Sequence, residues 1–299
     1  MKTNRNTGAL LKITASMLIF GSIGLVVRGI GLPSSVIALV RGAVGTVFLL
    51  AAGFCLRKKP SLAALRKNVL VLAVSGAAIG FNWILLFESY RYTTIATATT
   101  CYYTAPVFVM LLSPLVLRER LTTLRAVCAA VSLAGMTLVT GIVPDGFGGD
   151  LRGVAFALGA AVLYAAVMIA NRFLKNISAM DSTAAQLAAA TVVLLPYVCL
   201  TEQSPAAVES GSLWLLITAG VVHTGLAYLL YFSAMQDLSA QSTALCSYID
   251  PVAAILFSAL LLGEPMTPLQ TVGTVLILGS TLLSQLRIQK KGRTTHEHS

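Results

Sequence analysis

The sequence predicts an all-α integral membrane protein that crosses the bilayer ten times, as two inverted repeats of five helices each. Three observations lead to this prediction. The 299-residue chain is 57% hydrophobic and only 11% charged, with a mean hydropathy of +0.84. It holds ten apolar stretches long enough to span a membrane. Its first half also matches its second half, without a gap, over residues 101–127 and 246–272.

The composition excludes an ordinary soluble domain, in which roughly a quarter of the residues are charged. A chain this apolar cannot hide its surface in its own core, so lipid must be the solvent for much of it. The formal net charge of +10 would suggest nucleic acid in a soluble protein, so the positions of the basic residues decide its meaning.

A spanning helix needs about 20 mostly apolar residues. The candidate spans are 9–27, 35–55, 69–88, 94–117, 126–143, 153–171, 183–201, 213–235, 240–262 and 269–286. The loops between them are short, and none is long enough to form a soluble domain. The first span follows Lys2 and Arg5 as a signal peptide would, but no cleavage site follows it, so we expect it to remain as a helix.

Seventeen of the 21 lysines and arginines lie on one side of this arrangement, in the amino-terminal region, three loops and the carboxy-terminal tail. The other side has only Arg28, Arg91 and Arg152, and Arg41 lies within a span. The positive-inside rule then predicts a plasma (inner) membrane protein with both termini in the cytoplasm. The excess charge is a topology signal, so no nucleic-acid partner is expected.

The internal repeat has an offset of 145 residues. Cys101, Tyr103, Pro106 and Glu119 each meet the same residue type in the second half, whereas Ala105 meets Asp250. Each half has an odd number of spans, so the second half enters the membrane upside down, an arrangement that transporters use for alternating access. The predicted domains are residues 1–145 and residues 146–299, the second ending in a basic cytoplasmic tail.

The stretches "NWILLFESYRYTTIATATTCYYTAPVFVMLLSPLVLRERLT" at 82–122 and "YFSAMQDLSAQSTALCSYIDPVAAILFSALLLGEPMT" at 231–267 resemble the EamA-type family of the drug/metabolite transporter superfamily. In both, a Pro is followed about thirteen residues later by a Glu, and Arg41 matches a common family position. The resemblance covers about residues 9–286. It implies a basket of ten helices around a central cavity, lined largely by the third, fourth, eighth and ninth helices. It also implies secondary transport of metabolites such as amino acids, amines, nucleobases or sugars.

Asp250 is the leading candidate for substrate binding and for proton coupling. With a rise of about 1.5 Å per residue, it lies near the middle of the bilayer, where a carboxylate is costly. It either binds a cationic group or carries a proton, or it pairs with a neighbouring helix and holds the bundle together. His223, at a similar depth, either relays a proton or forms a neutral hydrogen bond between helices.

Two further charged residues lie near the outer end of their spans. Arg41 either binds a substrate carboxylate or has a structural role, holding Glu88 or a backbone carbonyl. Glu88 either forms an i,i+3 surface pair with Arg91 or belongs to an outer gate.

The remaining substrate-binding candidates are polar or aromatic residues of the spans, because a deep tyrosine needs a partner for its hydroxyl and a cavity wall supplies one. They are Asn82, Trp83, Tyr102, Tyr103, Tyr164, Tyr228 and Tyr248, and Tyr231 belongs to the same polar-aromatic set. Such a set with one Asp suits an amine or quaternary ammonium group through cation–π contact, and equally suits an aromatic or branched amino acid.

No catalytic, metal or cofactor site is expected. The five cysteines lie in or beside apolar segments without metal-ligand spacing, and no GxxxxGK[ST], HExxH or GxSxG motif occurs. The sequence thus favours a secondary transporter of a small organic metabolite, with export as the direction that the resemblance favours. Uptake of a cationic amine and a channel are the alternatives, and a membrane enzyme is disfavoured. For the oligomeric state, both a monomer and a homodimer are compatible with the sequence.

Overall fold

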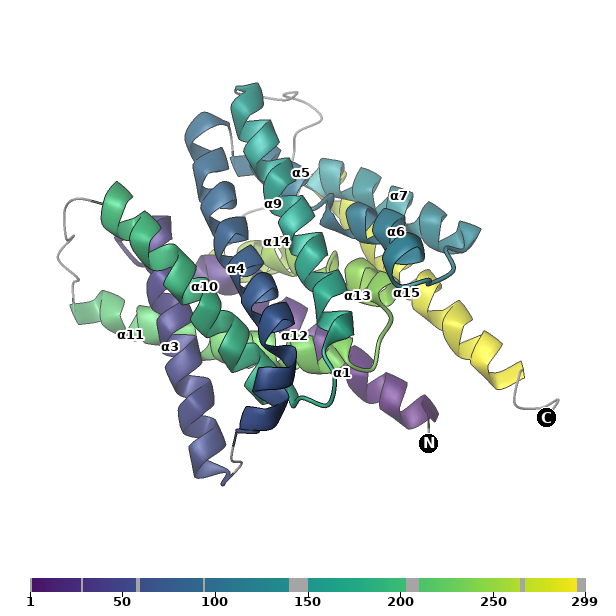
Figure 1. Ribbon diagram of the computed structural model, residues 1–299. Coiled ribbons are helices and arrows are strands. Elements are labelled where there is room, and N and C mark those ends of the chain that lie inside the picture. Colours follow the sequence, from purple (N-terminus) through teal and green to yellow (C-terminus); the bar gives the residue numbers. More distant parts are fainter. Residues whose placement is uncertain are drawn as a thin grey trace.

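The computed structural model describes residues 2–27, 29–57, 60–93, 95–139, 150–202, 210–263 and 267–294, which are almost entirely helical and contain no strand. Figure 1 shows a bundle of long helices, with the amino- and carboxy-terminal ends at the same side of the molecule. The all-α class predicted from the sequence is therefore confirmed.

The described residues of the first half form seven helices. They are α1 (Lys2–Gly21), α2 (Ile23–Val27), α3 (Ser34–Cys55), α4 (Leu62–Tyr92), α5 (Ile95–Tyr102), α6 (Ala105–Val116) and, at the end, α7 (Thr123–Val139). The predicted first span is α1 followed by α2, and the fourth is α5 followed by α6, so two predicted spans are interrupted helices.

The second half repeats this order. Its elements are α9 (Leu151–Ala170), the 3₁₀ turn η1 (Asn171–Phe173), α10 (Ala179–Thr201), α11 (Ser210–Gly220), the π-helix η2 (Val221–Leu226), α12 (Ala227–Met235), α13 (Ala240–Cys246), α14 (Ile249–Leu262) and α15 (Pro268–Thr294). The eighth span is α11, η2 and α12 in one run, and the ninth is α13 and α14.

Eight helical segments among the described residues are long and apolar enough to cross a membrane. The predicted fifth and tenth spans correspond to shorter apolar helices, Thr123–Val139 and Pro268–Leu283. Residues 140–143, which the prediction placed in the fifth span, lie outside the described residues. The protein is thus a multi-pass membrane protein, but ten is not confirmed as the number of crossings.

The local sequence determines where α15, the tenth predicted span, begins. Gln270 accepts from the backbone N–H of Thr267 at 2.9 Å, while the Gln270 N–H donates to the Thr267 hydroxyl at 3.2 Å. These two bonds form a capping box, with Pro268 at the first helical position. Thr122 has the corresponding place before α7, where its hydroxyl accepts from the Arg125 N–H at 3.4 Å.

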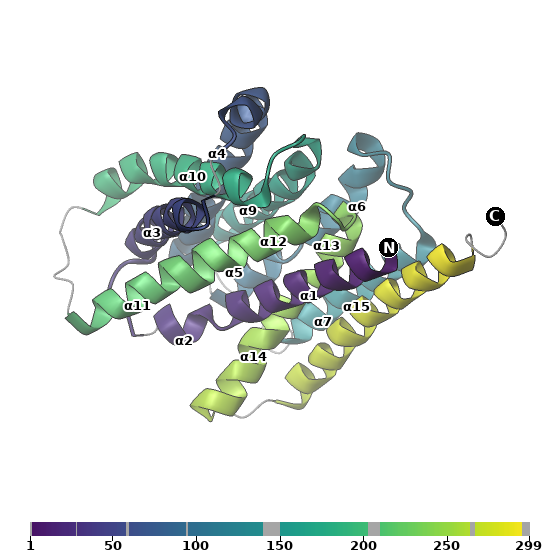
Figure 2. The same cartoon turned by 90° about the horizontal axis from the view of Figure 1, so that it is seen from below.

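The packing of the helices follows a two-fold pattern. Helix α4 packs on α9 and its repeat equivalent α12 packs on α1, while α3 packs on α10, α6 on α13 and α7 on α15. Figure 2 shows α1 beside α12 and α7 beside α15. Every contact between the halves in this set has a counterpart with the roles exchanged, as a two-repeat architecture requires.

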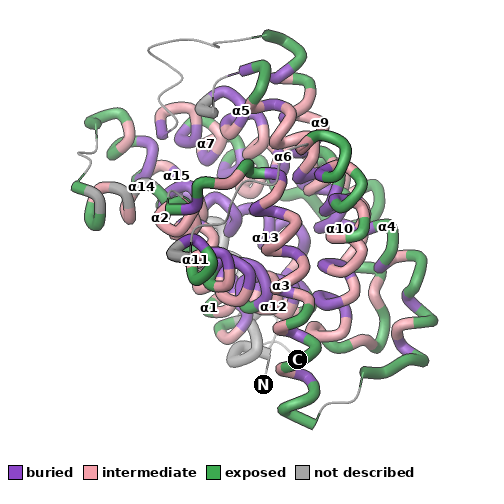
Figure 3. The backbone as a smooth tube through the Cα atoms, turned by 90° about the vertical axis from the view of Figure 1, so that its left-hand side faces the viewer, coloured by how far each residue is buried: buried purple, intermediate pink, exposed green. Residues whose placement is uncertain are grey.

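Both copies of the repeated hexamer interrupt a helix. "CYYTAP" ends α5 at Tyr102 and "CSYIDP" ends α13 at Cys246, and Pro106 and Pro251 lie in the first turn of the helices that follow. A proline is tolerated there because the first turn has no intrahelical acceptor for its N–H. Every residue of α13 is buried (Figure 3), so the second break lies deep inside the bundle.

Candidate substrate cavity

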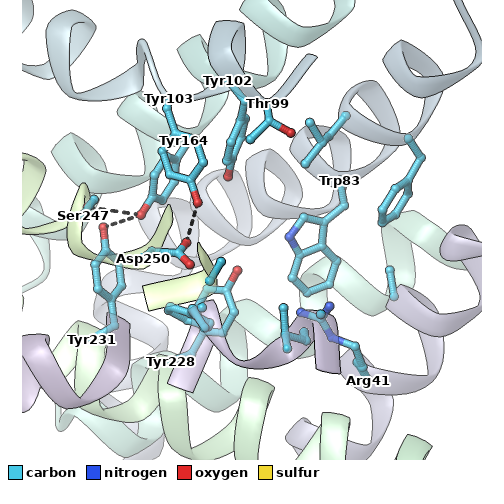
Figure 4. Close-up of a pocket in the computed structure, with 18 of the residues that line it drawn as sticks. Arg41, Trp83, Thr99, Tyr102, Tyr103, Tyr164, Tyr228, Tyr231, Ser247 and Asp250 are labelled. Atoms are coloured by element: carbon cyan, nitrogen blue, oxygen red, sulfur yellow. Dashed lines mark hydrogen bonds between the residues drawn. The ribbon is translucent and has the colours of Figure 1, made fainter. Parts of the chain in front are cut away.

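A cavity of about 520 Å³ lies among α1–α5 of the first half and α9, α12 and α14 of the second (Figure 4). It is lined by the predicted residues Arg41, Trp83, Tyr102, Tyr103, Tyr164, Tyr228, Tyr231 and Asp250. Its other lining residues include Phe20, Gly21, Phe87, Thr99 and Ser247. The wall is therefore rich in aromatic side chains, with one carboxylate and one guanidinium.

Asp250 faces the cavity from the start of α14, where it is half-buried. The Tyr103 hydroxyl donates a 2.7 Å hydrogen bond to its carboxylate from the break between α5 and α6 (Figure 4). Within the described parts of the chain, no lysine or arginine forms an ion pair with Asp250. The carboxylate is thus oriented by a neutral donor and leaves its charge unpaired towards the cavity.

Three hydroxyls form a polar cluster beside this carboxylate. The Tyr164 hydroxyl lies 2.9 Å from that of Tyr231 and 3.5 Å from that of Ser247. The ring of Tyr164 also stacks between those of Tyr102 and Tyr231, at centroid distances of 5.6 and 6.4 Å. Because α5, α9, α12 and the α13–α14 break each contribute a member, the cluster connects the two halves.

Arg41 reaches the cavity from α3. Its Nε donates to the Thr224 hydroxyl at 3.0 Å, and its guanidinium lies 5.6 Å from the centre of the Trp83 ring. The π-helical turn η2 directs Thr224 towards Arg41, since the Thr224 hydroxyl bonds the carbonyl of Ala219 five residues earlier. Figure 4 places Arg41 and Asp250 apart, with Trp83 and Tyr228 drawn between them.

Four candidate residues do not line this cavity. Asn82 is buried and donates to the Ala160 carbonyl at 2.6 Å, and Tyr248 is fully buried beneath the wall. His223 is buried as well and forms a 3.1 Å hydrogen bond with Ser22, and no hydrogen bond joins it to Asp250. These three side chains thus point into helix contacts in this conformation.

Glu88 is the fourth. Arg91 lies 3.2 Å from its carboxylate as the i,i+3 pair, and the Tyr197 hydroxyl donates to the same group. The structural alternative in which Arg41 holds Glu88 is wrong, because Arg41 bonds Thr224 instead. The polar groups around Glu88 border a smaller cavity of about 380 Å³ that shares Phe87 with the main one.

Several lining residues have no sequence feature that would single them out. Phe20 packs edge-on against Tyr228 at 5.1 Å, but in the sequence it is one apolar residue among many. Gly21 lies so close to α14 that a Cβ there would be 2.6 Å from the Asp250 carbonyl oxygen. The stretch "GSIG" at 21–24, with its two glycines, is the one sequence feature that could have indicated this close approach of two helices.

No group of three or more His, Cys, Asp or Glu side chains within the described residues could hold a metal ion. All five cysteines are free thiols, three of them buried.

Comparison with known proteins identifies the architecture. The model of the EamA-like transporter family matches the chain twice, over residues 7–141 and 151–286. The chain belongs to the EamA-like transporter family. The resemblance inferred from the two repeated stretches is confirmed, and the protein is a membrane transporter of this family.

Curated relatives match most of the length of the chain. The chain is 29% identical to the uncharacterized transporter YxxF of Bacillus subtilis (strain 168), covering 99% of this chain and 96% of that protein. It is 25% identical to Protein PecM of Dickeya dadantii (strain 3937), over 81% of this chain and 88% of PecM. A solved crystal structure superposes with a TM-score of 0.84 at 20% identity, covering 95% and 98% of the two chains, and so shares the fold.

Proposed function

We propose that this protein is a secondary transporter that moves a small organic metabolite carrying an amino group, foremost an amino acid, by alternating access. One observation carries this proposal: an aromatic cavity has the unpaired carboxylate of Asp250 on one part of its wall and the guanidinium of Arg41 on another. A zwitterion presents the two complementary charges, so one molecule can satisfy both groups.

Each part of the wall suits one part of such a substrate. A carboxylate at membrane depth is costly, so its retention next to a cavity favours a ligand cation or a proton. The rings of Tyr102, Tyr164 and Tyr228 can surround an ammonium group through cation–π contact or an apolar side chain through packing. Arg41 has free N–H donors for a carboxylate besides the Nε that binds Thr224.

The direction and setting of transport are part of the proposal. The distribution of basic residues favours a plasma membrane location with both termini in the cytoplasm. Then the cavity-lining ends of α2, α3 and α4 face outwards. Export is favoured by the family resemblance alone, since no residue of the cavity encodes a direction. One chain lines the entire cavity, so a monomer would be functionally complete.

A screen of purified protein for thermal stabilisation by amino acids, amines and nucleosides tests the substrate class. Any compound that stabilises the protein is then used for flux in proteoliposomes. We expect amino acids with large apolar side chains to give both stabilisation and counterflow. Flux that neither saturates nor shows counterflow would instead identify a channel, and stabilisation by nucleosides alone would reject the proposed class.

Proton-coupled uptake of a cationic amine or quaternary ammonium compound is the second candidate. It is favoured because no lysine or arginine among the described residues forms an ion pair with Asp250. A carboxylate without such a partner can exchange a proton for a cationic substrate. An imposed pH gradient separates the two candidates: it should drive accumulation of an amine under this alternative, with no dependence on a substrate carboxylate.

A further inference from the structure

Tyr103 and Tyr248 occupy the same position of the two repeated hexamers, 145 residues apart, yet their environments differ. Tyr103 is half-buried, lines the cavity and donates its hydroxyl hydrogen to Asp250. Tyr248 is 0% exposed and does not reach the cavity. Although the two halves are equivalent in sequence position, only one tyrosine of the pair lines the cavity, and the other is buried.

The hidden tyrosine has an unsatisfied hydroxyl. Tyr248 packs within an apolar cluster with Met110, Cys128, Val252 and Ile277, and its buried oxygen has no hydrogen-bond partner among the described residues. A hydroxyl buried in this way lowers stability unless some other state of the protein uses it. Phenylalanine would fill the same space without this penalty, so the oxygen needs an explanation.

A second pair of equivalent residues shows the same asymmetry. Phe87 is half-buried on the cavity wall, whereas Phe232 is only 2% exposed and packs against the rings of Tyr228 and Tyr231. In both pairs the residue of the first repeat lines the cavity and its equivalent in the second repeat is enclosed. Two separate positions of the repeat thus show the same asymmetry.

We propose that Tyr248 is a substrate-facing residue of the opposite conformation, in which the two repeats exchange roles and the cavity opens towards the other membrane face. This inference rests on the alternating access of the proposed function. In that state Tyr248 takes the place that Tyr103 has here, and Phe232 takes the place of Phe87. The Tyr248 hydroxyl then meets water or a polar group of the substrate.

The two states would not bind the substrate in the same way. Asp250 has Ala105 as its equivalent in the first repeat, so the exchanged state has no second carboxylate to hold the Tyr248 hydroxyl. That hydroxyl is left free for the substrate, whereas the hydroxyl of Tyr103 is bound to Asp250. The Asp250 carboxylate therefore stays available to the substrate in both states, whereas the tyrosine beside the substrate changes from Tyr103 to Tyr248.

Accessibility of cysteines to a membrane-impermeant methanethiosulfonate reagent tests this assignment without any substrate. The background protein has Cys55 and Cys199, the two exposed cysteines, replaced by serine, and its own labelling is the baseline. Tyr103→Cys and Tyr248→Cys are then compared in sealed vesicles of defined orientation. Cys55 or Cys199 restored singly, near opposite ends of the predicted spans, reports whether the reagent reaches each face.

We expect Tyr103→Cys to be labelled from one face and Tyr248→Cys from the opposite face, each several-fold above baseline. Protection of Tyr248→Cys from both faces, or labelling only from the face that reaches Tyr103→Cys, would overturn the proposal. Because the labelling needs no substrate, a failure to find transported amino acids leaves this result independent of the proposed function.

Tyr248→Phe supplies a conservative second variant. In the Tyr103→Cys protein it should multiply the ratio of the state that exposes position 103 to the opposite state by roughly five, the shift that one hydrogen bond of ordinary strength produces. The labelling rate at position 103 should rise accordingly, by up to that factor. A hydroxyl with no role in the second state would leave that rate unchanged, even if the thermal stability rises. An unchanged rate would therefore also count against the assignment.

Discussion

The hydroxyl of Tyr103 donates a 2.7 Å hydrogen bond to the carboxylate of Asp250, and this bond joins the helix breaks of the two repeats. Each break lies in the same hexamer, in which a proline occupies the first turn of the second helix. Only the second copy carries an acid. The duplicated backbone feature thus supplies the geometry, and the single substitution of Asp for Ala supplies the charge at which a substrate cation would bind.

Replacing that charge should reduce transport. Asp250→Asn retains the size of the side chain and can still accept from Tyr103, but it removes the negative charge from the cavity. We expect the transport rate of the identified substrate to fall by at least about tenfold, equivalent to ~1.4 kcal/mol. Proteoliposome flux measured over a range of pH checks this expectation.

Tyr103→Phe is the matched variant, since it removes the donor and keeps the carboxylate. It should weaken transport less than Asp250→Asn does and preserve the pH dependence. Full transport by Asp250→Asn with an unchanged pH profile would show that Asp250 only holds the bundle together.

Arg41 should distinguish substrates that carry a carboxylate from those that do not. Arg41→Gln removes the guanidinium, so the apparent affinity for an amino acid should fall about tenfold or more while that for the corresponding decarboxylated amine changes little. Arg41→Lys should not restore the amino acid, because an ammonium group neither reproduces the planar contact with Trp83 nor donates in the same fork. Competition by phenylalanine and by phenethylamine against the same labelled substrate measures the difference. Equal losses for both would reject carboxylate binding by Arg41.

Which residues share the cavity could be predicted only in part. Hydropathy and the 1.5 Å rise per residue indicate the depth of a side chain along its span, and Tyr103, Tyr164 and Asp250 all line one cavity. Depth does not fix direction around the helix axis. Tyr248 and His223 therefore share the level of the site but point into helix contacts.

Interruptions of the helices explain most of the cavity contacts that the sequence did not predict. The π-helix at Val221–Leu226 places Thr224 against Arg41, and the break after Gly21 brings α1 next to Asp250. Neither has a local sequence pattern as clear as that of the capping box at Thr267. Helix ends with side-chain caps are encoded locally, whereas a π-turn is stabilised by contacts with helices distant in sequence.

The crossing of α7 and α15 provides a stability test with an internal control. A Cβ at Gly135 would lie 2.8 Å from the Gly273 carbonyl oxygen and 2.9 Å from the Ile277 side chain, whereas a Cβ at Gly279 meets nothing within 4 Å. Gly135→Ala should therefore destabilise the protein by about 1–3 kcal/mol through overpacking. Gly279→Ala should be neutral or slightly stabilising, as usual within a helix. Thermal denaturation of both variants in one detergent checks the contrast, and similar melting temperatures would contradict this close approach.

Glu119 joins the end of α6 to the start of α13, where its carboxylate accepts from the backbone N–H groups of Ala240 at 3.0 Å and Gln241 at 3.4 Å. It thus caps a helix that belongs to the other repeat, and negative charge at a helix start is favourable. Glu119→Ala should lower stability by about 1 kcal/mol, and Glu119→Gln by less because an amide oxygen still accepts. Arg91→Gln, which removes an exposed ion pair with Glu88, should change stability much less. Thermal denaturation of the three variants tests this order, and a loss for Arg91→Gln as large as that for Glu119→Ala would show that the cap adds nothing beyond an ordinary surface charge.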